Sequence, residues 1–404
     1  MILLLAWRNI WRNKIRSLVV ILSIAIGLWA GVFMMAFAWG MYQSQLKEVI
    51  RYELSHIQIH HPDFYPDRDV KYFIPSAQNL VDEIRKSQFT EEVVLRSKAQ
   101  GMIMTPFSSF GVSISGIHPL EENSITGLSE MVIEGVYLDQ KQRHKVLIGQ
   151  KLAQKLKLRA KGKVVVMIQD LNGEIVSGAF RVCGIFKSRN SMFDERNIFI
   201  IRKDLNQLAS AYDQAHEIAV LLKSDDYVTS FQQSLKADYP GLKIESWREL
   251  NPELDLILES FNEYMFIFIG IILLALMFGI INTQLMAVLE RQKELGMLMA
   301  IGMNKFRLFA MILMESVFLA LIGGPFGVIL SYATVSLLHQ HGINLSMFSE
   351  GLSMYGFGNY VYPDLEYHRY VMVLLMTVTV AILSAVYPAW KALKLNPSEA
   401  IRKI

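Results

Sequence analysis

Four long apolar stretches constrain this 404-residue chain more than any other feature of its sequence. They occupy residues 18–41, 264–289, 308–338 and 370–390, and Glu315 is the one acidic or basic residue within them. A helix rises about 1.5 Å per residue, so roughly 20 apolar residues cross the roughly 30 Å of hydrocarbon in a bilayer. Hydrophobic residues make up 52% of the chain and charged residues 19%, which is typical of a membrane protein. The sequence therefore predicts four transmembrane helices.

Basic residues near the helix ends predict the orientation, because Lys and Arg beside transmembrane helices are retained in the cytoplasm. They gather before the first helix, between the second and third, and in the tail, at Arg8, Arg12, Lys14, Arg16, Arg291, Lys293, Lys305, Arg307, Lys391, Lys394, Arg402 and Lys403. The link between the third and fourth helices has only Arg369. Both termini are therefore expected in the cytoplasm and residues 42–263 outside it.

The outer segment has the pattern of a folded α+β domain, with period-2 apolar runs that predict strands and helical runs between them. Strands are expected at residues 56–60, 93–98, 111–117, 145–148, 163–169, 180–186, 217–222 and 243–245. Helices are expected at residues 77–86, 150–156 and 228–237, and a turn at Asn172 and Gly173. The first and last elements are expected to form one lobe and the middle ones another. The predicted fold class is a membrane α-helical protein with four transmembrane helices and a large two-lobed α+β extracytoplasmic domain between helices one and two.

Several chemical functions are disfavoured. The sequence contains no GxxxxGK[ST] phosphate loop, so a machine that uses ATP needs another chain to bind it. The net charge of +3 is small and the basic residues are scattered, which excludes a nucleic-acid partner. Cys183 is the only cysteine, so no disulfide can form within the chain, and a buried thiol without a catalytic role is expected.

Two sets of polar residues could serve a function or could simply be polar positions in contact with water. His56 and His60 alternate with Ile57 and Ile59, which places the isoleucines in a core and the histidines on a wetter face, and disfavours a metal site. Glu315 lies about two turns into the third apolar stretch, where an acid is a functional candidate. The favoured interpretation is that Glu315 lies at the cytoplasmic interface of the membrane, in contact with water.

Glycines in two of the predicted helices suggest packing and bending. Gly27 and Gly31 have GxxxG spacing, which would let a second helix approach closely. A kink is expected in the third helix at Gly323, Gly324, Pro325 and Gly327.

The link between helices two and three is the most informative short segment. It runs from Glu290 to Gly302, with charged residues first and apolar residues after. This order predicts a short amphipathic cytoplasmic helix closed by Gly302. The apolar face of such a helix suits a groove in a partner protein.

These features resemble the FtsX-like permease family, which includes MacB-type exporters and lipoprotein-releasing transporters. The matching residues are spread along the chain and comprise Ala6, Trp7, Arg8, Asn9, Arg12, Asn13, Lys14, Arg16, the run from Glu290 to Gly302, Glu315, the run from Gly323 to Gly327, Pro388, Ala389, Ala392, Pro397, Glu399, Ala400, Ile401 and Arg402. The resemblance implies a non-catalytic permease of the bacterial inner membrane. Two such subunits, alike or related, would pair, and a dimer of cytoplasmic ABC ATPases would bind ATP and Mg, so that this chain needs no cofactor.

In that scheme the link becomes the ATPase-coupling helix. The expected coupling residues are Glu290, Arg291, Lys293, Glu294, Leu295, Gly296, Leu298, Met299 and Gly302. Leu295, Leu298 and Met299 would supply the apolar anchor. The chain begins at the permease, so the ATPase is expected to be a separate chain. The predicted parts are an interfacial segment with helix one, the periplasmic domain, helix two, the coupling helix, helix three, a periplasmic loop, and helix four with the tail, at residues 1–41, 42–263, 264–289, 290–305, 306–338, 339–369 and 370–404.

The run from Ser55 to His60, followed by Pro62 and Tyr65, resembles the start of the periplasmic domain in lipoprotein-releasing subunits. The resemblance implies that the acylated end of a lipoprotein is held between membrane helices and passed to a periplasmic carrier. Large apolar residues on helices one and two are the expected substrate contacts, namely Phe33, Met34, Phe37, Phe261, Met265 and Phe268.

One departure keeps other functions open. Carrier-recruiting subunits have a longer, proline-bearing loop where residues 169–180 here make a short turn. The alternatives are a MacB-like exporter or mechanotransmission permease for peptides, drugs or envelope signals, and a non-transporting regulator of a cell-wall hydrolase.

Overall fold

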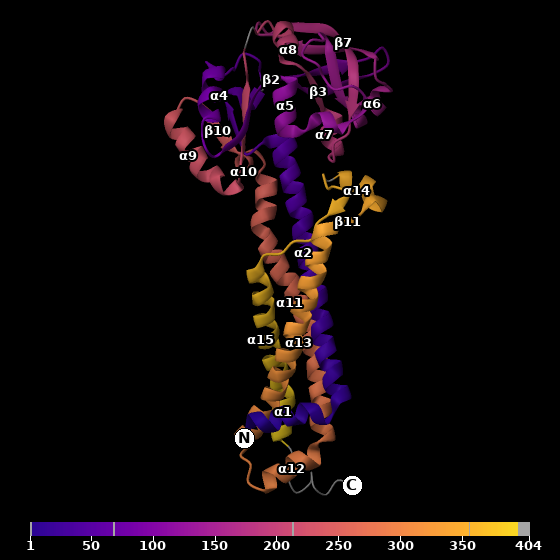
Figure 1. The fold of residues 1–404 in the computed structure, drawn as a ribbon, viewed down its shortest axis with the longest axis vertical. Helices are drawn as coiled ribbons and strands as arrows, with labels where there is room; N and C mark the ends of the chain where they lie inside the picture. The colour runs from indigo at the N-terminus through magenta and orange to yellow at the C-terminus, as the bar shows by residue number, and fades with distance from the viewer. Residues whose placement is uncertain (1, 68, 212–213, 355, 395–404) are drawn as a thin grey trace. The chain divides into compact units, whose positions relative to one another are not determined.

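The computed structural model describes residues 2–67, 69–211, 214–354 and 356–394 (Figure 1). The chain divides into two compact units. The membrane unit contains the described residues of Met1–Tyr42, Ile257–Asn344 and Tyr360–Ile404, and the α+β unit contains those of Gln43–Leu256 and Leu345–Asn359.

Long apolar helices make up the membrane unit. Its helices are α1 (Ile2–Arg12), α2 (Lys14–Val49), α11 (Pro252–Glu290), α12 (Gln292–Ala300), α13 (Lys305–His341) and α15 (Tyr367–Leu393), where α2 and α11 extend past the unit's limits. A two-stranded sheet joins β11 (Ile343–Asn344) to β12 (Tyr360–Val361). Within the described residues, four helices are long and apolar enough to cross a membrane, at Lys14–Leu54, Pro252–Glu290, Lys305–His341 and Tyr367–Leu393. The four predicted transmembrane helices are therefore present.

Glycines let the membrane helices approach one another closely. A Cβ on Gly327 of α13 would lie 2.7 Å from the Ala25 carbonyl oxygen of α2, and one on Gly323 would lie 2.9 Å from the Ile21 oxygen. A Cβ on Gly27 would lie 2.8 Å from Leu276 of α11. These glycines therefore serve helix packing. The helix α13 continues through Pro325, and the expected kink stays a prediction.

The α+β unit contains every strand and helix that was predicted for residues 42–263, together with several elements that the sequence patterns did not predict. Its strands are β1 (Ile57–His60), β2 (Thr90–Met104), β3 (Ser109–Ile117), β4 (Val132–Gly135), β5 (Lys145–Gly149), β6 (Lys163–Gln169), β7 (Ile175–Phe186), β8 (Asn197–Ile201), β9 (Glu217–Leu222) and β10 (Lys243–Ser246). Its α-helices are α3 (Phe64–Asp67), α4 (Ala77–Arg85), α5 (Pro119–Thr126), α6 (Gln150–Leu156), α7 (Ser191–Arg196), α8 (Arg202–Leu208), α9 (Val228–Asp238), α10 (Trp247–Leu250) and α14 (Ser349–Met354). The unit also has a π-helix, η1 (Ile50–Leu54), and the 3₁₀ helices η2 (Leu128–Met131), η3 (Asp225–Tyr227) and η4 (Ser346–Phe348).

The strands form one sheet in the order β10-β1-β9-β2-β3-β8-β5-β7-β4, with β6 paired to β2 and β7. Among the described residues three hydrophobic cores lie along this sheet, and β2 contributes to two of them. Val93 and Leu95 of β2 belong to the core that also contains residues of β1, β9 and β10. Ala99 and Ile103 of the same strand belong to a second core, built on β3, β5, β6, β7 and β8. The 15-residue strand β2 is therefore shared by these two cores.

Candidate functional site

The predicted helix of the link exists as α12, set off from α11 by a single residue. Arg291 has φ −101° and ψ 18°, which interrupts the helix between Glu290 and Gln292. At the other end Gly302 has φ +101°, its N–H donates to Met299 O at 3.1 Å, and the N–H of Met303 donates to Leu298 O at 3.0 Å. This is the Schellman pattern, which needs a left-handed residue and so favours glycine. The predicted end of the helix at Gly302 is confirmed.

The side chains that α12 buries and those that it exposes differ from the expected ones. Leu295 and Gly296 are buried, and Leu295 packs in a core of this chain with residues such as Ala6, Met311 and Ala389. Leu298 and Met299 pack partly against the same core. The prediction that Leu295 anchors a partner is therefore wrong, because its side chain already fills the permease's own core. Exposed apolar side chains on and just after α12 include those of Met297 and Ile301, at 53% and 80% exposure, and Phe306.

A polar cluster at the start of α12 joins residues of α1, α2, α11, α12 and α13. Glu315 of α13 accepts hydrogen bonds at its Oε1 from Asn9 Nδ2 of α1 at 2.7 Å and from Arg291 Nη1 at 3.2 Å. The Nε of Arg291 donates to Glu294 Oε2 at 3.2 Å. Two more ion pairs join Arg12 to Glu294 and Arg16 to Glu290. In Figure 1, α1 and α12 lie at the same end of the helix bundle.

Glu315 is buried at 7% exposure, which corrects the prediction that it is wetted at the interface. A buried carboxylate is costly unless it is paired and hydrogen-bonded, and Asn9 and Arg291 provide both. Partial burial opposes ionisation of Glu294, but hydrogen bonds from Arg12 and Arg291 hold the pKa of its carboxyl below the usual value. The sequence patterns missed Arg12 and Arg16 as ion-pair partners, because basic residues before a transmembrane helix also serve as an orientation signal. Nothing local in the sequence marks Asn9 as a partner of Glu315, which is distant in sequence.

The six predicted substrate residues fall into three groups. Met34, Met265 and Phe268 line one apolar cavity of about 120 Å³ between α2 and α11, together with Gly31, Met35, Ala38, Ile269 and Ile272. Phe33 and Phe37 lie in a row with Trp29, with ring centroids 6.3 Å and 6.4 Å apart. Phe261 is buried against Trp39 and Tyr42, with centroids 4.9 Å and 6.0 Å away. The structure thus brings three of the six together around one cavity.

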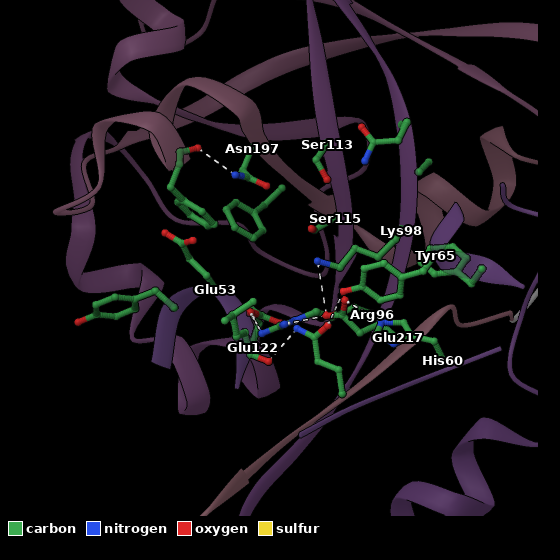
Figure 2. A pocket seen from close by; sticks show the side chains of 18 residues that line it. Glu53, His60, Tyr65, Arg96, Lys98, Ser113, Ser115, Glu122, Asn197 and Glu217 are labelled. Atoms are coloured by element: carbon green, nitrogen blue, oxygen red, sulfur yellow. Dashed lines mark hydrogen bonds and ion pairs between the residues drawn. The ribbon is translucent and has the colours of Figure 1, made fainter. Parts of the chain in front are cut away.

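A second cavity, of about 180 Å³, lies in the α+β unit where β2 passes from one core to the other (Figure 2). Arg96 of β2 is buried between two acids, with Nη2 donating to Glu122 Oε1 at 2.7 Å and Nη1 to Glu217 Oε1 at 2.8 Å. Burial opposes the charged guanidinium, but the two carboxylates outweigh it and raise the pKa of Arg96. Glu217 is also buried, yet Lys98, His60 and Arg96 hold its pKa well below the usual value.

His60 forms part of this cluster, which corrects its predicted place on a wet face. Its side chain is fully buried, with Nε2 3.4 Å from Glu217 Oε2 and the ring stacked on Phe64 at 5.6 Å. The strand β1 is covered on both faces, because Ile57 and Ile59 pack into a core on one face and Phe64 and Tyr65 lie against His60 on the other. The described residues contain no group of three or more side chains suited to a metal ion. The compensated charges of the cluster fit a structural role.

Cys183 is buried, as predicted. Its Sγ donates to Val146 O at 3.3 Å, and desolvation raises the pKa of the thiol to about 11. A thiol of this kind is unreactive.

Four membrane-spanning helices, with an α+β unit inserted after the first, form the architecture of a multi-pass membrane permease. The model of the MacB-like periplasmic core domain matches residues 17–238, more than half of the chain, and the model of the FtsX-like permease C-terminal region matches residues 266–397. The chain therefore belongs to the FtsX-like and MacB-like family of ABC transporter permeases, and the predicted family is confirmed. The predicted family residues Pro397, Glu399, Ala400, Ile401 and Arg402 lie outside the described residues.

Named relatives agree with this family. The lipoprotein-releasing system transmembrane protein LolC of Xylella fastidiosa (strain 9a5c) is 21% identical over 71% of this chain and 72% of its own length. An uncharacterised ABC transporter permease of Methanocaldococcus jannaschii is 24% identical over 99% of this chain and 97% of that protein. The macrolide export ATP-binding/permease protein MacB of Campylobacter jejuni is 21% identical over 99% of this chain and 61% of that protein. Membership of the family implies an ATPase and a second permease as partners, and relatives of the permease type are generally non-catalytic.

Proposed function

We propose that this chain couples ATP hydrolysis by a separate ABC ATPase to the release of lipoproteins from the inner membrane. The observation that carries the proposal is the apolar cavity between α2 and α11, lined by Met34, Met265 and Phe268. Each buried acyl methylene contributes about 0.8 kcal/mol, so a cavity that holds part of a chain retains it. The similarity to LolC supports a lipid-bearing substrate.

The proposed topology has both termini in the cytoplasm and the α+β unit in the periplasm as two lobes, one around the core of β1, β9 and β10 and the other around β3, β5, β6, β7 and β8. This orientation is inferred from the clusters of basic residues beside the membrane helices, including Arg12, Lys293 and Lys305, because such residues are retained on the cytoplasmic side. ATP and Mg are bound by the ATPase, and this chain needs no cofactor. A second permease subunit completes the assembly, and a periplasmic carrier receives the lipoprotein.

The proposed ATPase contact is the exposed side of α12 and its C-terminal end. Met297 and Ile301 provide apolar area there, and Lys293 provides an exposed charge at the start of the helix. The other predicted coupling residues have roles within the permease. Leu295 and Gly296 are buried and hold α12 against its neighbours, and Glu290, Arg291 and Glu294 form ion pairs at the break between α11 and α12. An apolar anchor with a charged rim is the usual composition of a strong contact.

Photocrosslinking tests the substrate. Benzoylphenylalanine at Met34 or Phe268 should capture acylated lipoproteins in cells whose ATPase is inactive, because loaded permease accumulates there. The control is the same group at Leu383, which is 58% exposed on α15 and does not line the cavity. Capture at Leu383 equal to that at Met34 and Phe268, or capture of no lipoprotein at either cavity position, contradicts the proposal.

A MacB-like exporter or mechanotransmission permease is the second candidate, because the MacB-like model matches residues 43–238 of the α+β unit and the turn after β6 is short. Asp170 closes that turn by accepting from the N–H groups of Asn172 and Glu174, both at 2.9 Å. Capture of soluble peptides or drugs at the cavity positions would favour this candidate. Regulation of a cell-wall hydrolase is the third candidate, and a dependence of hydrolase activity on the permease without any captured cargo would favour it.

A further inference from the structure

Arg291 is the residue at which α11 gives way to α12, and this break in the helix is the hinge between them. The guanidinium contacts Glu315 Oε1 of α13 at 3.2 Å and Glu294 Oε2 of α12 at 3.2 Å. The same Glu315 oxygen accepts from Asn9 of α1 at 2.7 Å. One carboxylate oxygen thus connects the hinge to two other helices.

The ion pair between Arg291 and Glu315 is more deeply buried than the ion pair between Arg12 and Glu294. The side chains of Glu315 and Arg291 are 9% and 16% exposed, whereas those of Arg12 and Glu294 are 56% and 42% exposed. Exposed pairs contribute little because water screens them, whereas removal of one partner from a buried pair leaves a charge unpaired. Among these ion pairs, the one between Glu315 and Arg291 is therefore the one that most strongly opposes movement of the start of α12 relative to α13.

We propose that Glu315 is a positioning residue that locks the hinge at Arg291 to α13, so that a displacement of α12 carries α13 with it. The proposal rests on the proposed function for the source of that displacement, a docked ATPase. The lock itself is a property of the permease alone, and it is tested without a partner.

The first test measures the distance between spin labels at Lys293 of α12 and Leu321 of α13, both exposed, in a Cys183→Ala permease in nanodiscs. The parent protein should give one narrow distribution. Glu315→Gln keeps the shape of the side chain, removes its charge and should widen the distribution at least twofold. Arg291→Gln should widen it equally, and the double variant should be no wider than either single one, because both remove the same contact.

Ser331→Ala is the matched control on α13, because Ser331 is buried and its hydroxyl donates only to Gly327 O of its own helix at 2.8 Å. It should leave the distribution unchanged. If Glu315→Gln does not fold, Asn9→Ala removes one hydrogen bond to the same oxygen and should give an intermediate width. A distribution of parental width in Glu315→Gln, or widening that adds in the double variant, overturns the proposal.

The second test adds the ATPase and traps the assembly with ATP and vanadate. In the parent the distance from position 293 to 321 should stay constant, because α12 and α13 move together. In Glu315→Gln it should shift, while the amount of co-purified ATPase stays at the parental level. Lys293 lies in the proposed ATPase contact, so binding is measured with the unlabelled parent as well as the labelled one. Failure of the ATPase to bind the unlabelled parent contradicts the proposed function and leaves the first test intact. A trapped parent whose distance shifts as much as that of Glu315→Gln contradicts the lock.

Discussion

Ile301 and Leu295 lie six residues apart on the same segment, and the structure predicts that their replacement causes different failures. Ile301 is 80% exposed, so Ile301→Asp removes almost no contact within the permease. Full burial of such a side chain in a partner contributes about 1.5–3 kcal/mol. At about 1.4 kcal/mol per tenfold, Ile301→Asp should weaken ATPase binding roughly 10- to 150-fold and leave the thermal stability of the permease unchanged.

Leu295→Ala should do the reverse. Leu295 is 2% exposed in the core with Leu308 and Met311, where truncation of a leucine costs about 2–5 kcal/mol. The melting temperature of the permease should therefore fall while the exposed side of α12 keeps its contacts.

The assay combines titration of labelled ATPase into detergent-solubilised permease with thermal unfolding followed by tryptophan fluorescence. Met297→Ser serves as a milder change on the exposed side and should weaken binding by less than Ile301→Asp. The reasoning fails if Ile301→Asp binds the ATPase as tightly as the parent protein. It also fails if Leu295→Ala abolishes binding without lowering the melting temperature.

Three further predictions concern the α+β unit and the topology. Arg96→Met should destabilise the chain by about 3–5 kcal/mol, because it leaves Glu122 and Glu217 buried without their cation, and an unchanged melting temperature would contradict this. Burial raises the pKa of Asp194 from 3.8 to about 6, so the folded state binds its proton more tightly and stability should fall as pH rises from about 4 to about 6, a dependence that Asp194→Asn should lose in pH-resolved thermal unfolding. A cysteine at Asp170 should react with an impermeant maleimide in intact cells and one at Lys305 should not, whereas the opposite pattern would reverse the proposed topology.

Sequence patterns predicted the membrane helices and the strands of the α+β unit because both depend on local periodicity. The strand β8 was missed, although its Asn197–Ile201 run is apolar, because five residues without alternation do not distinguish a buried strand from other buried segments. The alternation around His60 was recognised, but its meaning was not. The face that bears His60 is dry because Phe64 and Tyr65 cover it, and only the tertiary structure reveals that cover.

The candidate site was predictable in its position and not in its orientation. The end of α12 at Gly302 follows from the conformational freedom of glycine, which is a local property. Which apolar side chains of α12 face outward depends on contacts with α1, α13 and α15, whose residues are distant in sequence. For the same reason Glu315 resembled an interfacial acid until Asn9 and Arg291 were placed beside it.

The pairing of β1 has a consequence for the order in which the chain acquires its structure during synthesis. Ile57 and Ile59 pair with Val220 and Ile218 of β9 and with Ser246 and Ile244 of β10, so more than 150 residues are made before β1 meets its neighbours. The strands β2, β3, β5, β6, β7 and β8 of the second core are complete before then. Closing a long loop costs entropy that is offset only when its contacts form, so within the α+β unit the core around β1 should form after the second core. Until it does, β1 is an unpaired strand edge, and a nascent chain stalled at this stage is expected to depend on chaperones.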